Sequence, residues 1–256
     1  MSDSPTAALP ADTAHRPWPV PDRPWLVAMR WNELALLHWP VEPERLRPLV
    51  PDALELDLKE GRAWIGVTPF HMSEVRGRFL PPLPGMAAFP ELNVRTYVQA
   101  GDRPGIWFFS LDAANELAVT GARFLYGLPY HLAEMEVGTG GEGVDYRSER
   151  RTAGQTPIRF RASYRPDGPV ARAAPGSLEH WLSERYCLYA LRRRGLLRAD
   201  IHHAPWPLQP AVVAVEQNTM TRPLGIELVG APPVTHYARA LDVVAWSPEP
   251  VGAPAA

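Results

Sequence analysis

The chain has 256 residues, of which 46% are hydrophobic and 21% charged, a composition typical of soluble globular proteins. Its formal net charge of −2 at pH 7 gives no electrostatic basis for binding nucleic acid. No apolar run approaches the roughly 20 residues of a membrane-spanning helix, and the N-terminus lacks the charged and apolar regions of a signal peptide. These observations predict a cytoplasmic protein that binds neither nucleic acid nor a membrane.

Two residue types that often carry chemistry occur once each. Cys187 is the only cysteine, which excludes a disulfide framework and a cysteine-based zinc cage, and its apolar neighbours predict an inert, packed thiol. Lys59 is the only lysine, so the other permanently basic side chains are arginines. Any mechanism that needs a lysine amine therefore depends on this one residue.

Residues 1–24 are rich in proline and lack apolar periodicity, which predicts a flexible leader. From Trp25 onward, short segments rich in β-branched and aromatic residues alternate with turn residues, as expected of β-strands. Three hairpins are expected, with their turns at 59–61, 101–104 and 139–143. The segment "IRFRASY" is expected to extend the third hairpin into a meander.

Three short helices are expected between the strands. Pro43 favours a first helical turn, Asn115 and Gly127 are the start and stop signals of a second helix, and Ser177 is a good N-cap for a third. Many strands with few helices indicate a mainly β (α+β) fold, either a β-barrel or a strongly bent β-sheet.

The expected domain organisation is simple. A single domain is predicted over 25–247, with a flexible tail at 248–256 and no internal repeat. The long, proline-rich stretch 77–90 lies between predicted strands, which makes it a candidate lid or pocket rim.

The segment "PELNVRTYV" carries a polar ladder. Strand alternation places Glu91, Asn93, Arg95 and Tyr97 on one face and apolar residues on the other. A ladder of this kind is common on the solvated face of an antiparallel sheet. It would equally suit the interior of a barrel, where a carboxylate and a guanidinium converge on a polar ligand. Because the partner strand "GIWFFSLDA" is apolar, the sequence favours the barrel interior and the solvated face equally.

The segment "GARFLYGLPYHLAEME" places Tyr130 and His131 directly after a turn fixed by Pro129. On a strand the two side chains would point to opposite faces, with His131 among apolar residues and Tyr130 among carboxylates. Ordinary packing explains both residues, since a lone histidine on an apolar face is usually a core residue. The alternative is that Tyr130 and His131 form an acid–base pair. Arg123 lies on the preceding helix, away from the apolar face of that helix.

These motifs together resemble a known family. A Gly/Ala-Arg pair, a short helix and a Gly-x-Pro break resemble the active-site segment of acetoacetate decarboxylase-like proteins, in which two lysines follow the proline. The ordered series "LVPDALELDLKEGRAWIGVTPF", "PELNVRTYV", "FFSLDA", "GLPY", "SLEHWLSERY" and "HHAPWPL" resembles the YqjF-like family of uncharacterised proteins in the same superfamily, and the resemblance covers about residues 25–246. The resemblance implies an acetoacetate decarboxylase-like fold with a central pocket.

The sequence departs from the superfamily at the catalytic position. Tyr130 and His131 stand where the lysines of the decarboxylases would be, and neither side chain can form an imine. Lys59 lies in the predicted turn "DLKEGR", where nothing would lower the pKa of its amine. We therefore expect no Schiff-base chemistry, and the sequence indicates no cofactor.

A metal site is also not expected. His202 and His203 are adjacent, so on a strand they would point to opposite sides and could not bind one ion together. Further ligands would have to come from His71, Glu216 or His236, which show no recognisable spacing.

Two charged residues, Arg185 and Asp112, lie near predicted helix ends. Arg185 is expected to pair with helix-end charges, although it could instead reach the pocket as an anion clamp. Asp112 is expected to be a cap or turn residue where strand passes to helix.

The first functional hypothesis is an enzyme that acts on a small carboxylate- or carbonyl-bearing metabolite. Arg95, with Arg123, would hold a carboxylate by bidentate contact, and Glu91 would transfer protons with its pKa raised by burial. Tyr130 or His131 would polarise a carbonyl group. Decarboxylation, hydration, enolisation and isomerisation all remain open.

The second hypothesis is a binding protein that uses the same pocket without catalysis. Glu91, Asn93 and Arg95 would orient a small-molecule ligand against aromatic walls. The aromatic residues expected in the walls are Trp64, Phe70, Trp107, Phe108 and Trp206. A third alternative is a barrel filled by its own side chains, and a homo-oligomer is compatible with all three.

Overall fold

The computed structural model describes residues 12–81, 85, 88–140, 143–193 and 195–252, and it is built mainly from β-strands. The strands are β1 Val27–Val41, β2 Glu55–Leu56, β3 Ala63–Gly77, β4 Ala88–Ala100, β5 Arg103–Ala113, β6 Tyr130–Leu132, β7 Glu134–Gly140, β8 Gly143–Arg150, β9 Ile158–Pro166, β10 Cys187–Arg192, β11 Gly195–His203, β12 Gln209–Asn218, β13 Val234–Ala245 and β14 Glu249–Pro250. The helices are α1 Pro43–Leu46, α2 Glu116–Tyr126 and α3 Leu178–Ser183, with 3₁₀ turns at Arg47–Leu49 and Arg222–Leu224. The expected mainly β fold with a few short helices is confirmed.

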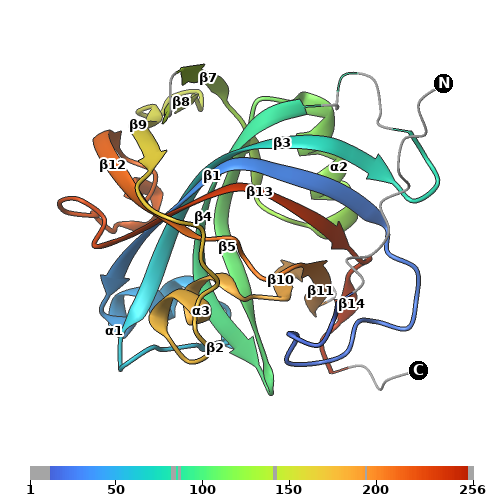
Figure 1. Ribbon diagram of the computed structural model, residues 1–256. Helices are drawn as coiled ribbons and strands as arrows, with labels where there is room; N and C mark the ends of the chain where they lie inside the picture. The colour runs from blue at the N-terminus through green and yellow to red at the C-terminus, as the bar shows by residue number, and fades with distance from the viewer. Residues whose placement is uncertain (1–11, 82–84, 86–87, 141–142, 194, 253–256) are drawn as a thin grey trace.

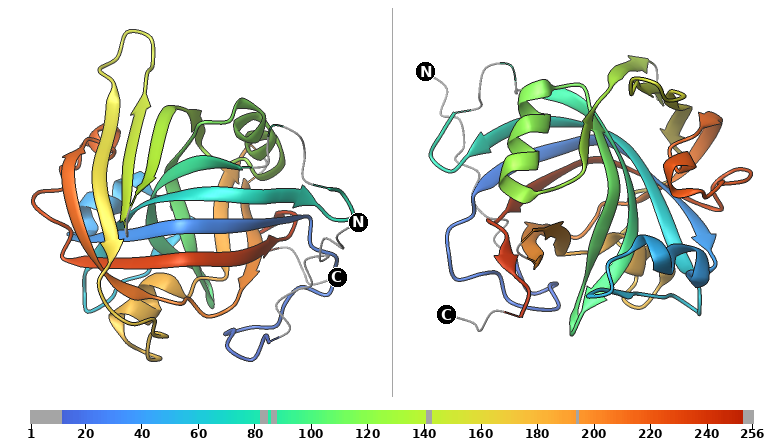
Figure 2. Two further views of the ribbon diagram at one scale, coloured as in Figure 1. Left: turned by 45° about the horizontal axis from the view of Figure 1, so that its top comes forward. Right: turned by 180° about the vertical axis from the view of Figure 1, so that it is seen from behind.

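The strands form one large, strongly bent sheet (Figure 1). Its order is β14-β11-β10-β5-β4-β3-β1-β13-β12-β9-β8-β7, and β11 pairs in addition with β13. The path from β13 through β1, β3, β4, β5 and β10 therefore returns through β11 to β13. Helix α2 lies at one end of this curved wall, whereas α1 and α3 lie at the other (Figure 2).

The start and stop signals of the helices act as the sequence predicts. The side chain of Asn115 accepts a hydrogen bond from the backbone of Ala118, and Gly127 ends α2 with a φ of 70°. Ser177 caps α3 in the same way, and Pro43 occupies the first turn of α1. Local chemistry therefore sets the bounds of all three helices.

Two of the three expected hairpins form as predicted, and one does not. β4 pairs with β5 and β7 pairs with β8, while β9 continues the meander from β8. The turn at 59–61 is present, since Lys59 and Arg62 exchange backbone hydrogen bonds. The short strand before this turn, β2, pairs with β4 instead of with β3. The prediction of a hairpin around 59–61 is therefore wrong.

The segment Tyr130–Leu132 lies before the third hairpin and is separate from β7. It forms the strand β6, which pairs in parallel with β5. The Leu111 amide donates to the carbonyl of Pro129 at 3.0 Å, and the Ala133 amide donates to the carbonyl of Ala113. This pairing fixes Tyr130 beside the hairpin β4–β5.

Part of the expected leader packs against the fold. Residues 1–11 lie outside the described residues, but Arg16 and Trp18 are both only 8% exposed. The indole of Trp18 donates to Asp200 on β11 at 2.9 Å, and Arg16 donates to the Ile201 carbonyl. The flexible leader predicted for 1–24 is therefore not correct for these residues, because their partners lie almost 200 residues away in the sequence.

Two further expectations fall partly outside the described residues. The candidate lid at 77–90 includes 82–84 and 86–87, and the predicted tail includes 253–256. Of the tail, Glu249–Pro250 forms β14, which pairs with β11.

The buried side chains gather on both sides of the central strands. One cluster includes Leu34, Phe70, Leu111 and Trp206, and a second, under β8, β9 and β12, includes Leu92, Tyr146 and Phe160.

Within the described ranges, none of the helices has the length and apolar character needed to cross a membrane.

Candidate active site

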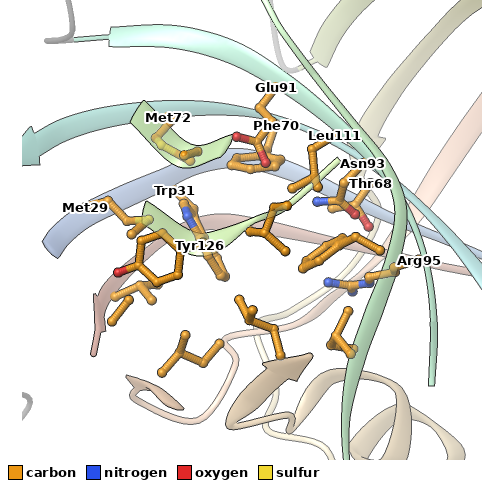
Figure 3. Close-up of a pocket in the computed structure, with 18 of the residues that line it drawn as sticks. Met29, Trp31, Thr68, Phe70, Met72, Glu91, Asn93, Arg95, Leu111 and Tyr126 are labelled. Carbon is orange, nitrogen blue, oxygen red and sulfur yellow. The ribbon is translucent and has the colours of Figure 1, made fainter. Parts of the chain in front are cut away.

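A cavity of about 200 Å³ lies inside the bent sheet. Its walls come from β1, β3, β4, β5, β11, β13 and α2, and most of the lining side chains are apolar. Figure 3 shows the polar exceptions on β3 and β4, with Glu91, Asn93 and Arg95 turned toward the same space. The polar ladder therefore faces the interior, and the solvated-face interpretation is wrong.

The register of β3 and β4 arranges the lining residues in rungs. Thr68 lies opposite Asn93, Phe70 opposite Glu91, and Met72 opposite Phe89. Because side chains on one face of a strand recur every second residue, successive rungs are about 6.6 Å apart. The cavity wall thus passes from polar to apolar along the strands.

Glu91 is buried at the middle rung. Its side chain is 2% exposed, and burial raises the pKa of its carboxyl group from 4.5 to about 8. The nearby charge of Asp112 also raises this pKa, while the hydroxyl of Tyr130 lowers it by donating to Oε2 at 2.9 Å. Glu91 is therefore mostly protonated at neutral pH and can give or take a proton near physiological conditions.

The backbone beneath Glu91 is also fixed. The hydroxyl of Tyr146, on β8, donates to the carbonyl of Glu91 at 2.7 Å. Tyr130 is held in turn by Arg123, whose Nε donates to the Tyr130 carbonyl at 2.7 Å. Both contacts reach the pair from outside the cavity, so they limit how far Glu91 and Tyr130 can move.

Arg95 supplies the positive charge of the cavity. It is 7% exposed and, among the described residues, has no carboxylate partner, unlike the buried arginines Arg150 and Arg185. It lies near the hydroxyl of Tyr97, which is 2.7 Å from Nε2 of His38. A buried, unneutralised guanidinium is costly, so this arrangement favours an anionic ligand.

Several buried polar atoms from residues of the cavity lining have no hydrogen-bond partner among the described residues and could meet a ligand. They include Oγ1 of Thr68, Oδ1 of Asn93, Nε of Arg95, Nη2 of Arg185 and Nε1 of Trp206. Buried polar atoms are normally satisfied, and all five of these residues line the cavity. A polar ligand would provide the missing partners.

Arg185 is charge-paired next to the end of α3 and also lines the cavity, while its use as an anion clamp stays a prediction. It forms an ion pair with Asp57, donates through Nε to the carbonyl of Trp181 at 2.7 Å, and stacks on the rings of Tyr97 and Trp181. It also lines the cavity with its remaining nitrogen free of partners among the described residues.

Of the eleven residues named in the two hypotheses, seven line this cavity and four do not. The lining residues are Glu91, Asn93, Arg95, Tyr130, Phe70, Phe108 and Trp206. His131, Arg123, Trp64 and Trp107 are not among the lining residues.

His131 lies on the opposite face of β6 from Tyr130. It pairs with Asp112 in the sheet, and burial with Arg150 and Arg123 nearby lowers the pKa of its imidazole to about 4. Strand alternation predicted this separation of Tyr130 from His131, and it removes His131 from the cavity.

Sequence reasoning missed some cavity residues. Thr68 belongs to an alternating series with Phe70 and Met72, a signal that could have placed it on the same face. Tyr126 lies on α2 with its hydroxyl unpaired among the described residues, and no local pattern marks it. His38 stands behind Tyr97 only because β1, β3 and β4 are neighbours.

The amine of Lys59 is hydrogen-bonded away from the cavity. Its Nζ donates to the carbonyl of Gly176 at 2.7 Å in an exposed turn, and Lys59 is not among the cavity residues.

The two adjacent histidines have different surroundings. His203 lines the cavity, whereas Nδ1 of His202 lies 3.3 Å from the Arg16 guanidinium. The part of the chain that the structure describes contains no group of three or more His, Cys, Asp or Glu side chains placed to hold a metal.

Comparisons with known proteins agree with this architecture. The model of the DUF2071 family, described as an uncharacterized conserved protein, matches residues 28–242. The chain belongs to this family. It is 46% identical over 227 residues to the protein YqjF of Bacillus subtilis (strain 168), covering 89% of this chain and 93% of the relative.

Solved structures place the DUF2071 fold beside the acetoacetate decarboxylases. The acetoacetate decarboxylase of Legionella pneumophila superposes with a TM-score of 0.60 at 14% identity, covering 93% of each chain. The enduracididine biosynthesis enzyme MppR complexed with pyruvate also gives 0.60, at 12% identity over 89% of this chain and 90% of MppR. At these identities the likeness establishes the fold, which is the acetoacetate decarboxylase-like fold expected from the sequence.

Proposed function

We propose that this protein binds a small carboxylate-bearing carbonyl compound and transfers protons on it through Glu91, without a Schiff base. The observation that carries the proposal is the Glu91–Tyr130 hydrogen bond of 2.9 Å inside a cavity that also contains an unpaired arginine. Arg95 binds the ligand carboxylate, and Asn93 with Thr68 supplies further hydrogen bonds. MppR, a structural neighbour, was solved with pyruvate bound, which supports a ligand of this chemistry.

The chemical step that these residues can support is enolisation. Ionised Glu91 takes a proton from the carbon next to the carbonyl, and the electron pair moves onto the carbonyl oxygen. Return of the proton at another position is an isomerisation, and departure of a group from the adjacent carbon is a lyase reaction. Tyr130 stabilises the ionised form of Glu91 by donating to it, so a usable fraction of carboxylate exists near neutral pH.

Solvent-proton exchange tests this step. Pyruvate and 2-oxobutanoate are incubated with the protein in D₂O, and loss of the C3 proton signals is followed by NMR. We expect exchange above the buffer rate with wild type, none with Glu91→Gln, and at least a tenfold loss with Arg95→Met. His131→Gln serves as the control, since His131 lies outside the cavity lining and should leave exchange unchanged.

The same experiment addresses the alternative, a binding protein without catalysis. The observation that favours this alternative is the protonated state of Glu91 at neutral pH, because a neutral acid can donate a hydrogen bond without reacting. Wild-type exchange at the buffer rate, together with saturable binding that Arg95→Met abolishes, would establish the alternative and reject the enzymatic proposal.

A further inference from the structure

The cavity is polar at one end and apolar at the other. Arg95, Asn93 and Thr68 lie at one end, and Met29, Met72 and Tyr126 lie at the other (Figure 3). Glu91 stands between them, two strand positions from Asn93 on one side and from Phe89 on the other. The strand rise places the Arg95 and Phe89 backbones about 20 Å apart along β4.

The polar end is deeply buried. Thr68, Asn93 and Arg95 are 1%, 5% and 7% exposed, respectively. Leu125, which lines the cavity from α2, is 43% exposed. A ligand that places its charged group at Arg95 therefore has its remaining atoms among the apolar side chains toward α2.

The volume sets the size of the apolar part. A cavity of about 150 Å³ suffices for a benzene molecule. The roughly 200 Å³ available here therefore holds an aryl ring or a short alkyl chain in addition to a carboxylate arm. A two- or three-carbon keto acid at Arg95 would leave the apolar end unfilled.

Resting on the proposed function of this same site, we infer that the ligand is an amphipathic monocarboxylate with an aryl or alkyl body. The carboxylate binds Arg95 at the deeply buried end, the carbons next to it pass Glu91, and the apolar body packs between Met72, Phe89 and Tyr126 near α2. Specificity for the body comes from the apolar rung, which is separate from the groups that bind the carboxylate.

Calorimetric titration with a ligand series tests this inference on the wild-type protein. The probes are butanoate, 4-phenylbutanoate and the neutral 4-phenylbutanamide. Because each buried methylene is worth about a factor of four in Kd, we expect 4-phenylbutanoate to bind at least tenfold more tightly than butanoate. The amide should bind at least tenfold more weakly than the acid, and Arg95→Met should remove that difference.

A pair of variants on α2 locates the apolar body. Ala122 lines the cavity and Thr120 is exposed on the same helix and not part of the lining, so Ala122→Phe should fill the apolar end while Thr120→Phe should not. We expect Ala122→Phe to weaken 4-phenylbutanoate binding at least tenfold and to leave butanoate binding within twofold. Thr120→Phe should change neither.

The outcomes separate the two proposals. If butanoate and pyruvate bind but 4-phenylbutanoate binds no more tightly than butanoate, the amphipathic ligand is rejected and the carboxylate site stands. If none of the carboxylates binds, the proposed function itself fails. Loss of butanoate binding in a folded Ala122→Phe protein would also contradict the inference, because the two ends would then not be independent.

Discussion

The hydroxyl of Tyr130 donates to Oε2 of Glu91 across the gap between β6 and β4, over 2.9 Å. The two residues are 39 positions apart in the sequence, and the parallel pairing of β6 with β5 brings them together. Burial of Glu91 opposes its ionisation, and this one hydrogen bond offsets part of that effect. The proton affinity of the site is thus set by a contact that sequence alone does not reveal.

Replacing Tyr130 with phenylalanine should raise the pKa of Glu91 above its value of about 8. The change removes the donor that favours the carboxylate and leaves the apolar surroundings in place, so we expect an upward shift of about one unit. A ¹³C NMR titration of labelled glutamate side chains, with Glu91→Gln for assignment, measures it. Tyr126→Phe is the matched control, because its hydroxyl has no partner among the described residues. A lower or unchanged midpoint in Tyr130→Phe would contradict the role of this hydrogen bond.

Glu91 should also make the fold less stable at alkaline pH. Between pH 4.5 and about 8 the folded protein retains a proton on Glu91 that the unfolded chain has released, so stability falls as pH rises through this window and levels off above it. Glu91→Gln has no such titration. We expect its free energy of unfolding, relative to wild type, to increase by about 3 kcal/mol from pH 5 to pH 8, measured by urea unfolding. Parallel pH profiles for the two proteins would show that Glu91 ionises normally.

Much of the local structure was predictable because its causes are local. The caps of α2, the turn between β4 and β5 and the alternation of Glu91, Asn93 and Arg95 depend on residues a few positions apart. The side chain period of two decides which residues share a face, but not which face is enclosed. That choice depends on how the whole sheet bends.

The incorrect expectations all concern contacts between distant segments. Arg16 and Trp18 lie in a proline-rich stretch that resembles a linker, yet their partners on β11 bury them. The short strand β2 was expected to pair with β3 across the turn at 59–61, but it pairs with β4. No periodicity within a segment encodes such pairings.

Binding of a carboxylate should weaken as pH rises through about 8. Ionisation of Glu91 over this range adds a second negative charge near the ligand. Coulomb repulsion between the two carboxylates in a partly desolvated cavity predicts a loss of at least about tenfold in affinity. Calorimetry with butanoate at about pH 6, 7.5 and 9 measures it. Glu91→Gln should show a flat profile, and a wild-type affinity that stays constant or increases would argue against a protonated Glu91.

Gly66 should matter because Arg95 packs directly over it. A Cβ at this position would lie 3.2 Å from both Cγ and Nε of Arg95 and 3.3 Å from Cδ2 of His38. These distances are tighter than ordinary van der Waals contact, so the side chain of Arg95 must shift by a few tenths of an ångström. We expect Gly66→Ala to weaken butanoate binding about tenfold, since bidentate contact with a carboxylate depends on the orientation of the guanidinium.

Gly138→Ala is the matched control for this substitution. Gly138 is an exposed residue of β7, and a Cβ there would meet only Asp145, at 3.9 Å. It should bind butanoate as wild type does, with a similar melting temperature. A Gly66→Ala protein that folds and binds butanoate normally would show that Arg95 can bind the ligand without the space that the missing Cβ of Gly66 leaves for its side chain. A loss of binding confined to Gly66→Ala, restored neither by a longer nor by a more apolar carboxylate, would instead place the defect at the deeply buried, charged end of the cavity.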